Sequence, residues 1–129
     1  MRLLIAISAL LMLAVSCKKS REYEGLGLRE NSCKTLTIGG QNVNICFEEL
    51  VEDSRCPANV NCIWQGVAKG RFKFTVNNHS TIFHLSTLTL APHYQNEVIV
   101  SGYKIKLINI FPYPGTGGGN PSADVEITQ

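Results

Sequence analysis

Five cysteines carry most of the reactive chemistry in this sequence of 129 residues: Cys17, Cys33, Cys46, Cys56 and Cys62. A thiol can act as a nucleophile, ligate a metal or form a disulfide. Zinc ligation is disfavoured, because the chain has neither a CxxC motif nor a closely spaced cysteine–histidine pair. Nucleophilic catalysis needs a reduced thiol beside a base. The chemistry of the thiols therefore depends on the compartment that the chain enters.

The N-terminal stretch MRLLIAISALLMLAVSC reads as an export signal. Arg2 supplies a positive start, and the run from Leu3 to Val15 is apolar except for Ser8. Such a run spans about 20 Å as a helix, whereas a hydrocarbon core is about 30 Å thick, so a secretion signal fits and a membrane-spanning anchor does not. A buried N-terminal helix is the alternative, but the run is apolar all round and abuts the charged segment KKSREYE.

The end of this run, LAVSC, resembles the bacterial lipobox, although Ala14 stands where leucine is more usual. The resemblance implies a signal peptide of residues 1–16, cleavage before Cys17, and acylation of Cys17 on its sulfur and its new amino group, including palmitate. Several acyl chains anchor a protein stably. We therefore expect a membrane-anchored lipoprotein of the bacterial cell envelope, at the outer membrane or facing the periplasm if the cell is Gram-negative. An ordinary signal peptide with an incidental cysteine is the alternative.

Export also decides the expected state of the other four cysteines. An even number of cysteines in an exported chain predicts two disulfides, with three possible connectivities. That leaves no reduced thiol for catalysis, and no Ser-His-Asp order or carboxylate pair can be assembled from the chain. We therefore predict a protein that is not an enzyme and has no cofactor. Loss of Arg2 lowers the formal charge from +2 to +1, which excludes nucleic acid as an electrostatic partner.

The segment CKTLTIGGQNVNIC predicts which cysteines pair. Gly39-Gly40 between two alternating stretches indicates a hairpin with a type I′ turn. In that register Leu36 faces Val43 and Cys33 faces Cys46, at a non-hydrogen-bonded pair with Cα atoms about 4.5 Å apart. The apolar side chains share one face and the disulfide lies on the polar face. Cys56 then pairs with Cys62.

Three further stretches alternate with the period of β-strands: residues 71–85, 98–114 and 123–129. The first is a hairpin whose turn centres on Asn77-Asn78 or on Asn78-His79. The second is one long bent strand or two short ones, ended by Pro112 and Pro114. Only residues 46–53 (CFEELVED) would also suit one helical turn. The pattern predicts an all-β fold, an antiparallel β-sandwich with two disulfides, with an Ig-like arrangement or an open barrel as alternatives.

The predicted organisation has three parts. Residues 1–16 are the signal peptide, and residues 17–32 are the lipidated N-terminus and a flexible tether with a span of about 20 Å. Residues 33–129 form a single β domain, long enough for one modest core.

Three groups of polar residues are possible binding sites. The acidic cluster Glu48, Glu49, Glu52 and Asp53 lacks the glycine and the alternating oxygen ligands of a calcium loop, so a solvated turn is expected. Residues 115–120 (GTGGGN) lack the Lys-Ser/Thr pair of a phosphate loop and are expected to be mobile. The three histidines are scattered along the chain and are expected to be solvated: His79, His84 and His93.

The segment EDSRCPANVNCIWQG, residues 52–66, resembles a segment of small bacterial envelope lipoproteins of uncharacterised function, with the form DSRCP-x4-C-x-W-x-G. The resemblance implies a β architecture and an envelope location and carries over no catalytic residue. Physically, Cys56 and Cys62 close a short loop that Pro57 stiffens, and Trp64 is expected to lie against the disulfide near the core. Arg55 is expected to help pin the loop to the sandwich.

Two functions for this segment follow. In the favoured one it is a structural clasp within an envelope domain that has a structural or protein-interaction role. In the alternative it is a recognition loop of a protease-inhibitor-like or ligand-binding lipoprotein, because a preorganised loop loses little entropy on binding. The residues of this candidate recognition loop are Pro57, Ala58, Asn59, Val60, Asn61 and Trp64. The expected partners are the membrane, through acyl chains on Cys17, and a protein of the envelope.

Overall fold

Three two-residue turns, each with both central residues at positive φ, organise the strands into hairpins. They are Gly39-Gly40 (58° and 80°), Asn77-Asn78 (50° and 60°) and Ser101-Gly102 (51° and 83°). Positive φ at both positions is the type I′ geometry, whose twist matches that of the strands it joins. The second turn therefore centres on Asn77-Asn78, with Val76 opposite His79. The third divides residues 97–111 into two strands.

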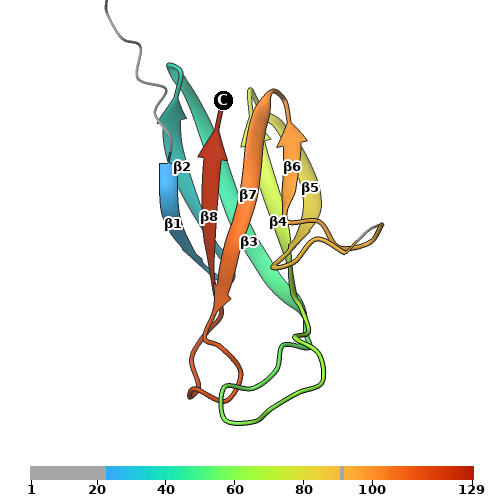
Figure 1. Cartoon of the computed structure of the whole chain (residues 1–129). Helices are drawn as coiled ribbons and strands as arrows, with labels where there is room; N and C mark the ends of the chain where they lie inside the picture. The colour runs from blue at the N-terminus through green and yellow to red at the C-terminus, as the bar shows by residue number, and fades with distance from the viewer. Residues whose placement is uncertain (1–22, 91) are drawn as a thin grey trace, which may run out of the picture.

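The computed structural model describes residues 23–90 and 92–129, and Cys17 and the predicted signal peptide lie outside them. The strands are β1 (Tyr23–Arg29), β2 (Ser32–Ile38), β3 (Gln41–Asp53), β4 (Ala68–Val76), β5 (His79–Ser86), β6 (Glu97–Val100), β7 (Tyr103–Phe111) and β8 (Ser122–Thr128). They form two antiparallel four-stranded sheets, β1-β8-β7-β6 and β2-β3-β4-β5, stacked as a sandwich (Figure 1). The predicted all-β sandwich with two disulfides is confirmed.

The core lies between the two sheets and follows the period-two alternation of the strands. In β4 every second residue is buried, and in β7 Tyr103, Ile105 and Leu107 point inward. Phe47 and Phe72 stack across β3 and β4 with ring centroids 5.1 Å apart. The largest fully buried side chains come from both sheets: Leu28, Ile45, Phe47, Phe72, Phe74, Leu85, Ile105, Leu107, Ile110 and Ile127.

The domain begins about ten residues earlier than predicted, which corrects the boundary of the tether. Residues 23–29 form β1, an edge strand that pairs with β8 through Leu26 opposite Val125 and Leu28 opposite Ala123. Leu28 is fully buried in the core. The charged and glycine-containing sequence hid this strand, because only Leu26 and Leu28 supply its apolar face.

The ambiguous segment 46–53 continues β3 in the extended conformation. Two register shifts against β4, at Phe47/Glu49 and at Leu50/Glu52, let this long strand bend toward the end of the sandwich. The described residues contain no helix, and so none long and apolar enough to cross a membrane.

Candidate functional site

Two loops lie side by side at one end of the sandwich, opposite the end where the chain enters β1 (Figure 1). One is the β3–β4 connection, residues 54–67, which contains the Cys56–Cys62 disulfide. The other is the β7–β8 connection, residues 112–121. The backbone N–H of Ala58 donates to the carbonyl of Pro114 at 2.9 Å. A Cβ on Gly115 would lie 2.7 Å from the Asn59 side chain, so the two loops are in close contact.

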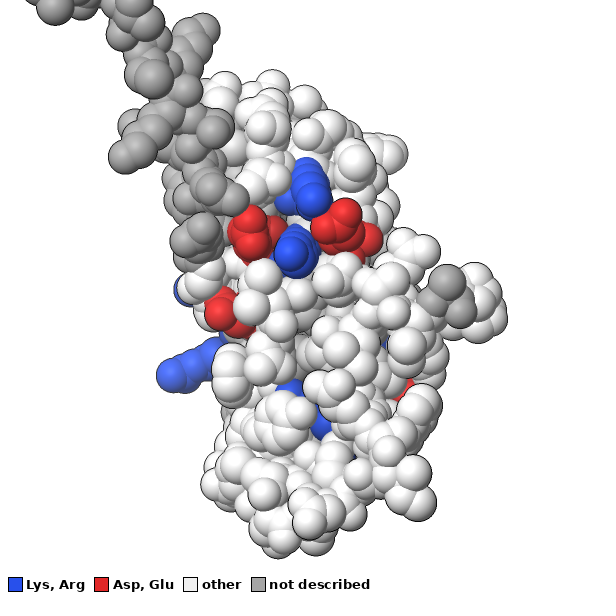
Figure 2. Space-filling model, in the orientation of Figure 1, with Lys and Arg blue, Asp and Glu red and all other residues white. Residues whose placement is uncertain are grey.

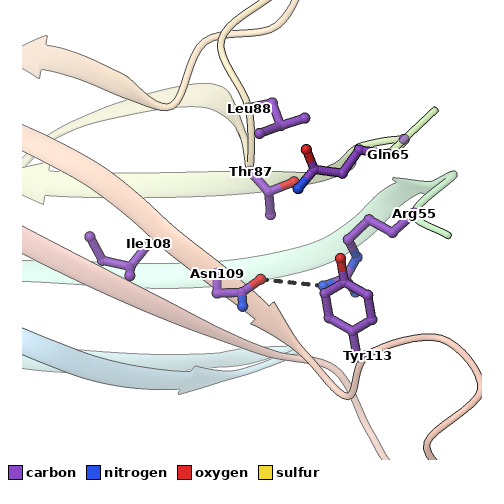
Figure 3. A pocket seen from close by; sticks show the side chains of 8 residues that line it. Arg55, Gln65, Thr87, Leu88, Ile108, Asn109 and Tyr113 are labelled. Carbon is purple, nitrogen blue, oxygen red and sulfur yellow. Dashed lines mark hydrogen bonds between the residues drawn. The ribbon is translucent and has the colours of Figure 1, made fainter. Parts of the chain in front are cut away.

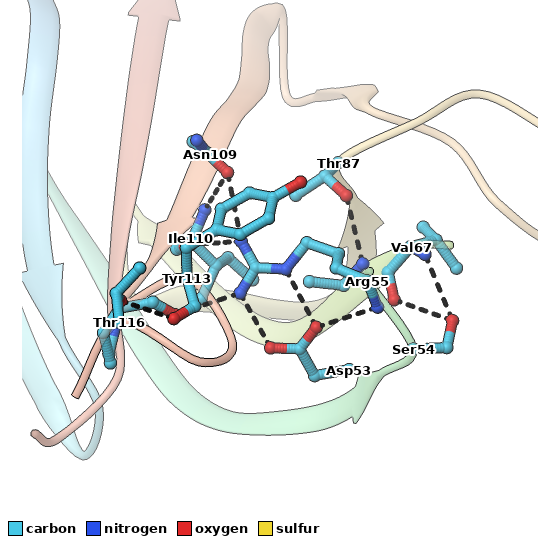
Figure 4. Close-up of polar contacts among 11 residues, drawn as sticks. Asp53, Ser54, Arg55, Val67, Thr87, Asn109, Ile110, Tyr113 and Thr116 are labelled. Carbon is cyan, nitrogen blue, oxygen red and sulfur yellow. Dashed lines mark hydrogen bonds and ion pairs between the residues drawn. The ribbon is translucent and has the colours of Figure 1, made fainter. Parts of the chain in front are cut away.

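A buried arginine joins these loops to each other and to the sheet. The Arg55 side chain is 2% exposed and forms a two-pronged ion pair with Asp53, with Nε–Oδ1 2.8 Å and Nη2–Oδ2 2.7 Å (Figure 4). Asp53 also accepts the backbone N–H of Arg55 at 3.3 Å. This carboxylate therefore orders the chain where β3 ends.

The remaining donors of Arg55 reach across to β7 and the loop after it. Nη1 donates to the carbonyl of Ile110 at 2.5 Å and to Asn109 Oδ1 at 3.3 Å, and Nη2 donates to the carbonyl of Pro112 at 3.2 Å. The Tyr113 ring covers the guanidinium at 4.5 Å. An arginine has five N–H donors, and all five have an acceptor here. Arg55 is therefore a structural pin with no donor left for an anionic ligand.

A pocket of about 180 Å³ lies beside this arginine, between β7 and the loops that follow β3 and β5 (Figure 3). Gln65, Thr87 and Leu88 line one side, and Asn109 and Tyr113 line the other. Neither a carboxylate nor a histidine or thiol lines it. Because general acid–base and nucleophilic catalysis need such groups, the lining offers binding groups only.

The base of the disulfide loop is closed by backbone pairs. Ser54 N–H donates to the carbonyl of Val67 at 2.8 Å, and Cys56 N–H donates to the carbonyl of Gln65 at 3.0 Å. Gly66 has φ +70°, and a Cβ there would lie 1.8 Å from the Ser54 carbonyl oxygen. Only glycine fits this approach, which explains the glycine that ends the sequence motif. The Cys56–Cys62 disulfide spans Cα atoms 5.8 Å apart.

The position of Trp64 is a correction to the sequence analysis. Trp64 is 68% exposed and lies neither against the core nor in a strand, since the backbone bends at Ile63 and Trp64. Ile63 beside it is fully exposed, and Val60 is 51% exposed. The sequence suggested an extended strand, in which alternation would turn the indole inward. The bend turns both side chains outward instead. We call Val60, Ile63 and Trp64 the tip.

The rest of the predicted recognition loop surrounds the tip. Ala58, Asn59 and Asn61 are exposed, and Pro57 is half-buried against the second loop. Val60 N–H donates to the carbonyl of Pro57 at 3.2 Å, which forms a turn within the disulfide ring.

The other disulfide forms as the hairpin register predicted. Cys33 and Cys46 are opposite each other in β2 and β3, with Cα atoms 4.0 Å apart. They share the polar outer face with Thr35 and Asn44, whose side chains are hydrogen-bonded. Cys46 itself is buried. This bond is far from the two loops and serves the sheet.

The acidic cluster is not the solvated turn that was expected. Its four carboxylates lie along the end of β3, and each of them has at least one partner. Glu48 and Glu49 form ion pairs with Arg71, and Glu48 also pairs with Lys73. Glu52 accepts the Tyr94 hydroxyl at 3.1 Å, which raises the pKa of Tyr94 through this hydrogen bond and through the negative charge of the carboxylate.

The remaining candidate residues do not come together in one site. His79, His84 and His93 are each exposed. Across residues 23–90 and 92–129, no three histidine, cysteine or acidic side chains lie close enough together to hold a metal. Residues 113–116 form a turn in which Thr116 donates to the Tyr113 carbonyl at 2.6 Å, and this turn packs on the disulfide loop.

Asn109 and Tyr113 are the site residues that the sequence analysis missed. Neither belongs to a motif, and both lie more than 50 residues from Arg55 along the chain. Tyr113 between two prolines was a usable signal, because an aromatic ring on a stiff turn is a common cover for a guanidinium.

Charge divides the molecule into two regions. Charged side chains gather over the middle of the β6-β7-β8 face, where Lys104 pairs with Glu97 at 3.1 Å, and the end formed by the two loops is largely white (Figure 2). The sequence agrees, since residues 56–67 and 112–121 contain no Lys, Arg, Asp or Glu.

Comparison with known proteins gives no relative: no family model, curated protein or solved structure matches this chain. The function must therefore be argued from the site itself.

Proposed function

We propose that this chain is a lipid-anchored protein of the bacterial envelope whose small β-sandwich presents the disulfide loop, residues 56–64, as a binding surface. It acts by contact and not by catalysis. The observation that carries the proposal is the exposure of Ile63 and Trp64 on a loop whose ring is closed by the Cys56–Cys62 disulfide and whose base is closed by backbone hydrogen bonds. Large exposed apolar side chains that protrude together mark interaction sites.

The construction of the loop supports binding over a purely structural clasp. A clasp turns its apolar side chains toward the body that it holds, whereas the tip turns Ile63 and Trp64 to solvent. The loop is already attached to the sandwich by Arg55, by the backbone hydrogen bonds within residues 54–67 and by the hydrogen bond between Ala58 and Pro114. A loop fixed in this way loses little conformational entropy when it binds.

The anchor is supported by the sequence at Cys17, and membrane fractionation tests it. Cys17→Ser should release the protein from membranes, while Lys18→Gln, the adjacent control, should leave it bound. A Cys17→Ser protein that stays in the membrane fraction would contradict lipid anchoring.

The binding surface is tested by crosslinking in intact envelopes. The double variant Ile63→Ser/Trp64→Ala should lose an envelope component that the wild type retains. Ile99→Ser is the matched control, because Ile99 is 74% exposed on β6. If the double variant and the control retain the same components as the wild type, the loop is not a binding surface.

A protease-inhibitor-like role is the second candidate, favoured by the full exposure of Ile63 directly after Cys62. It predicts stoichiometric inhibition of a serine endopeptidase with an apolar primary pocket, lost on Ile63→Ser. Cleavage of the loop at the rate of an ordinary substrate would remove this candidate.

A further inference from the structure

The tip is an uncharged and apolar set of exposed side chains on one loop. Ile63 is fully exposed, Trp64 is 68% exposed and Val60 is 51% exposed, and the bend at residues 63–64 turns the first two outward. The side chains around them are short or carry neutral amides, such as Ala58, Asn59 and Asn61. Apolar side chains as exposed as these can enter a cleft in a partner.

The charge of this end restricts the chemistry of the partner. Residues 56–67 and 112–121 carry no charged side chain. The guanidinium that joins the two loops belongs to Arg55, whose charge is paired with Asp53 and whose five N–H donors are occupied. The tip itself therefore carries no charge that would attract phosphates, acidic peptides or anionic headgroups. It can enter an apolar environment without removing a charge from water.

The backbone of the tip favours a protein over a bilayer. In the described chain, the peptide groups of residues 61–64 make no hydrogen bond to another protein group. Such groups become unsatisfied in hydrocarbon, but a cleft in a protein can pair with them through its own backbone, as in strand addition.

The position of the tip also favours a protein partner over the bilayer. It lies at the opposite end of the sandwich from the start of β1 (Figure 1). β3 alone has 13 residues, which extend about 40 Å. Only five residues separate Cys17 from Tyr23, a reach of about 20 Å at full extension. An upright domain anchored at Cys17 therefore holds the tip away from its own bilayer.

We infer that the tip inserts Ile63 and Trp64 into an uncharged apolar cleft of another envelope protein. This inference rests on the proposed function and names its partner class. Ile63 and Trp64 are the binding hot spots, because large apolar side chains at the centre of an interface contribute most of its affinity. Asn59 and Asn61 form the polar rim.

The experiment places a photo-crosslinking amino acid at position 63 or 64 of the full chain in living cells. Position 99 on β6 and position 82 on β5 are controls, since Ile99 and Ile82 are 74% and 51% exposed. A discrete adduct with one protein at positions 63 and 64, absent at 82 and 99, is expected. Adducts of equal yield at all four positions would overturn the inference.

The captured protein is then purified and its affinity for the full chain in detergent is measured. Ile63→Ser and Trp64→Ala should each weaken binding about 30-fold, and Ile99→Ser less than about twofold. Because the interface is uncharged, the affinity should change less than about threefold between 0.05 and 0.5 M NaCl. A steep salt dependence, or full affinity in both tip variants, would overturn the inference.

Neutral phosphatidylcholine vesicles provide the competing arm. Trp64 is the only tryptophan in the chain, so its fluorescence reports directly on insertion. A blue shift of the Trp64 fluorescence with vesicles, without a protein adduct, would overturn the inference that the partner is a protein cleft. The proposal that the loop is a binding surface would still hold. If neither a protein adduct nor a blue shift is observed, both the protein cleft and the binding function of the loop are ruled out.

Discussion

Arg55 and Asp53 form a two-pronged ion pair at the point where β3 ends and the disulfide loop begins, with N–O distances of 2.8 and 2.7 Å. Two residues that are almost adjacent in sequence thereby aim one guanidinium at β7, which is more than 50 residues away. The pair is buried on the arginine side, with 2% of that side chain exposed. The arginine fixes both loops relative to the sandwich, and the tip depends on that fixation.

Replacing Arg55 tests this dependence. Arg55→Met leaves the Asp53 carboxylate without its partner and the carbonyls of Ile110 and Pro112 without donors, and should lower the free energy of unfolding by about 3–5 kcal/mol. Arg55→Lys should rescue little, because an ammonium cannot reproduce the fork. Urea denaturation measures both, with Lys34→Met, at an exposed position of β2, as the control. A loss below about 1 kcal/mol in Arg55→Met would show that the network is dispensable.

Gly66 allows a sharper comparison between two glycines. Gly66→Ala requires a left-handed backbone and puts its Cβ 1.8 Å from the Ser54 carbonyl oxygen, so we expect a loss of about 3 kcal/mol or more. Gly118→Ala, whose Cβ meets nothing within 4 Å, should stay within about 0.5 kcal/mol of wild type. Thermal unfolding compares the two variants. Equal stability would mean that the 54–67 loop adopts another backbone.

The two disulfides should contribute differently. Chain entropy gives about 3 kcal/mol for the bond between Cys33 and Cys46 and about 2.4 kcal/mol for the shorter ring between Cys56 and Cys62. Each pair is replaced by alanines and unfolded in urea. Replacing Cys56 and Cys62 should in addition make residues 56–66 sensitive to proteolysis at urea concentrations below the global unfolding transition. If this variant is cleaved only when the whole domain unfolds, the disulfide does not hold the loop.

Tyr94 should titrate at a higher pH than an ordinary tyrosine. Its hydrogen bond to Glu52, and then the charge of that carboxylate, raise the pKa of Tyr94 above its usual value of 10.0. Because the folded pKa is the higher one, this contact stabilises the fold below pH 10 and is lost as the pH rises through the folded pKa. Ultraviolet titration of wild type, Tyr94→Phe and Glu52→Gln identifies the group, with Glu97→Gln as the control. An unshifted pKa in wild type would show that the hydrogen bond does not persist in solution.

Tyr103 presents a buried hydroxyl that has no hydrogen-bond partner within the described residues. Tyr103→Phe keeps the ring against Phe74, at 5.4 Å between centroids, and removes the unpaired group. We expect the free energy of unfolding to stay equal or to rise by about 1 kcal/mol. Tyr103→Leu, which also removes the ring, should lower it by about 1–2 kcal/mol. A clear loss in Tyr103→Phe would mean that the hydroxyl is paired.

Local patterns in the sequence were sufficient for the first hairpin and for both disulfides. They left the turn of the second hairpin open between two positions, and they left residues 98–114 as one bent strand or two short ones. Gly39-Gly40 and the alternation around it place Cys33 opposite Cys46, because a two-residue turn leaves one register. The remaining pair follows by elimination. In the alternating stretch 98–114, Tyr103, Ile105 and Leu107 share one face because the period of a strand is two, and that relation can be read from the sequence.

Only the tertiary structure decided which side chains of the disulfide loop are exposed and what holds that loop. Trp64 was expected inward from strand alternation, but a bend at residues 63–64 removes the alternation on which that prediction depended. Leu28 became core only because β8, almost 100 residues away, pairs with the strand that carries it. Arg55 likewise finds Ile110 and Pro112 through sheet packing, and no periodicity in a sequence encodes a contact over that separation.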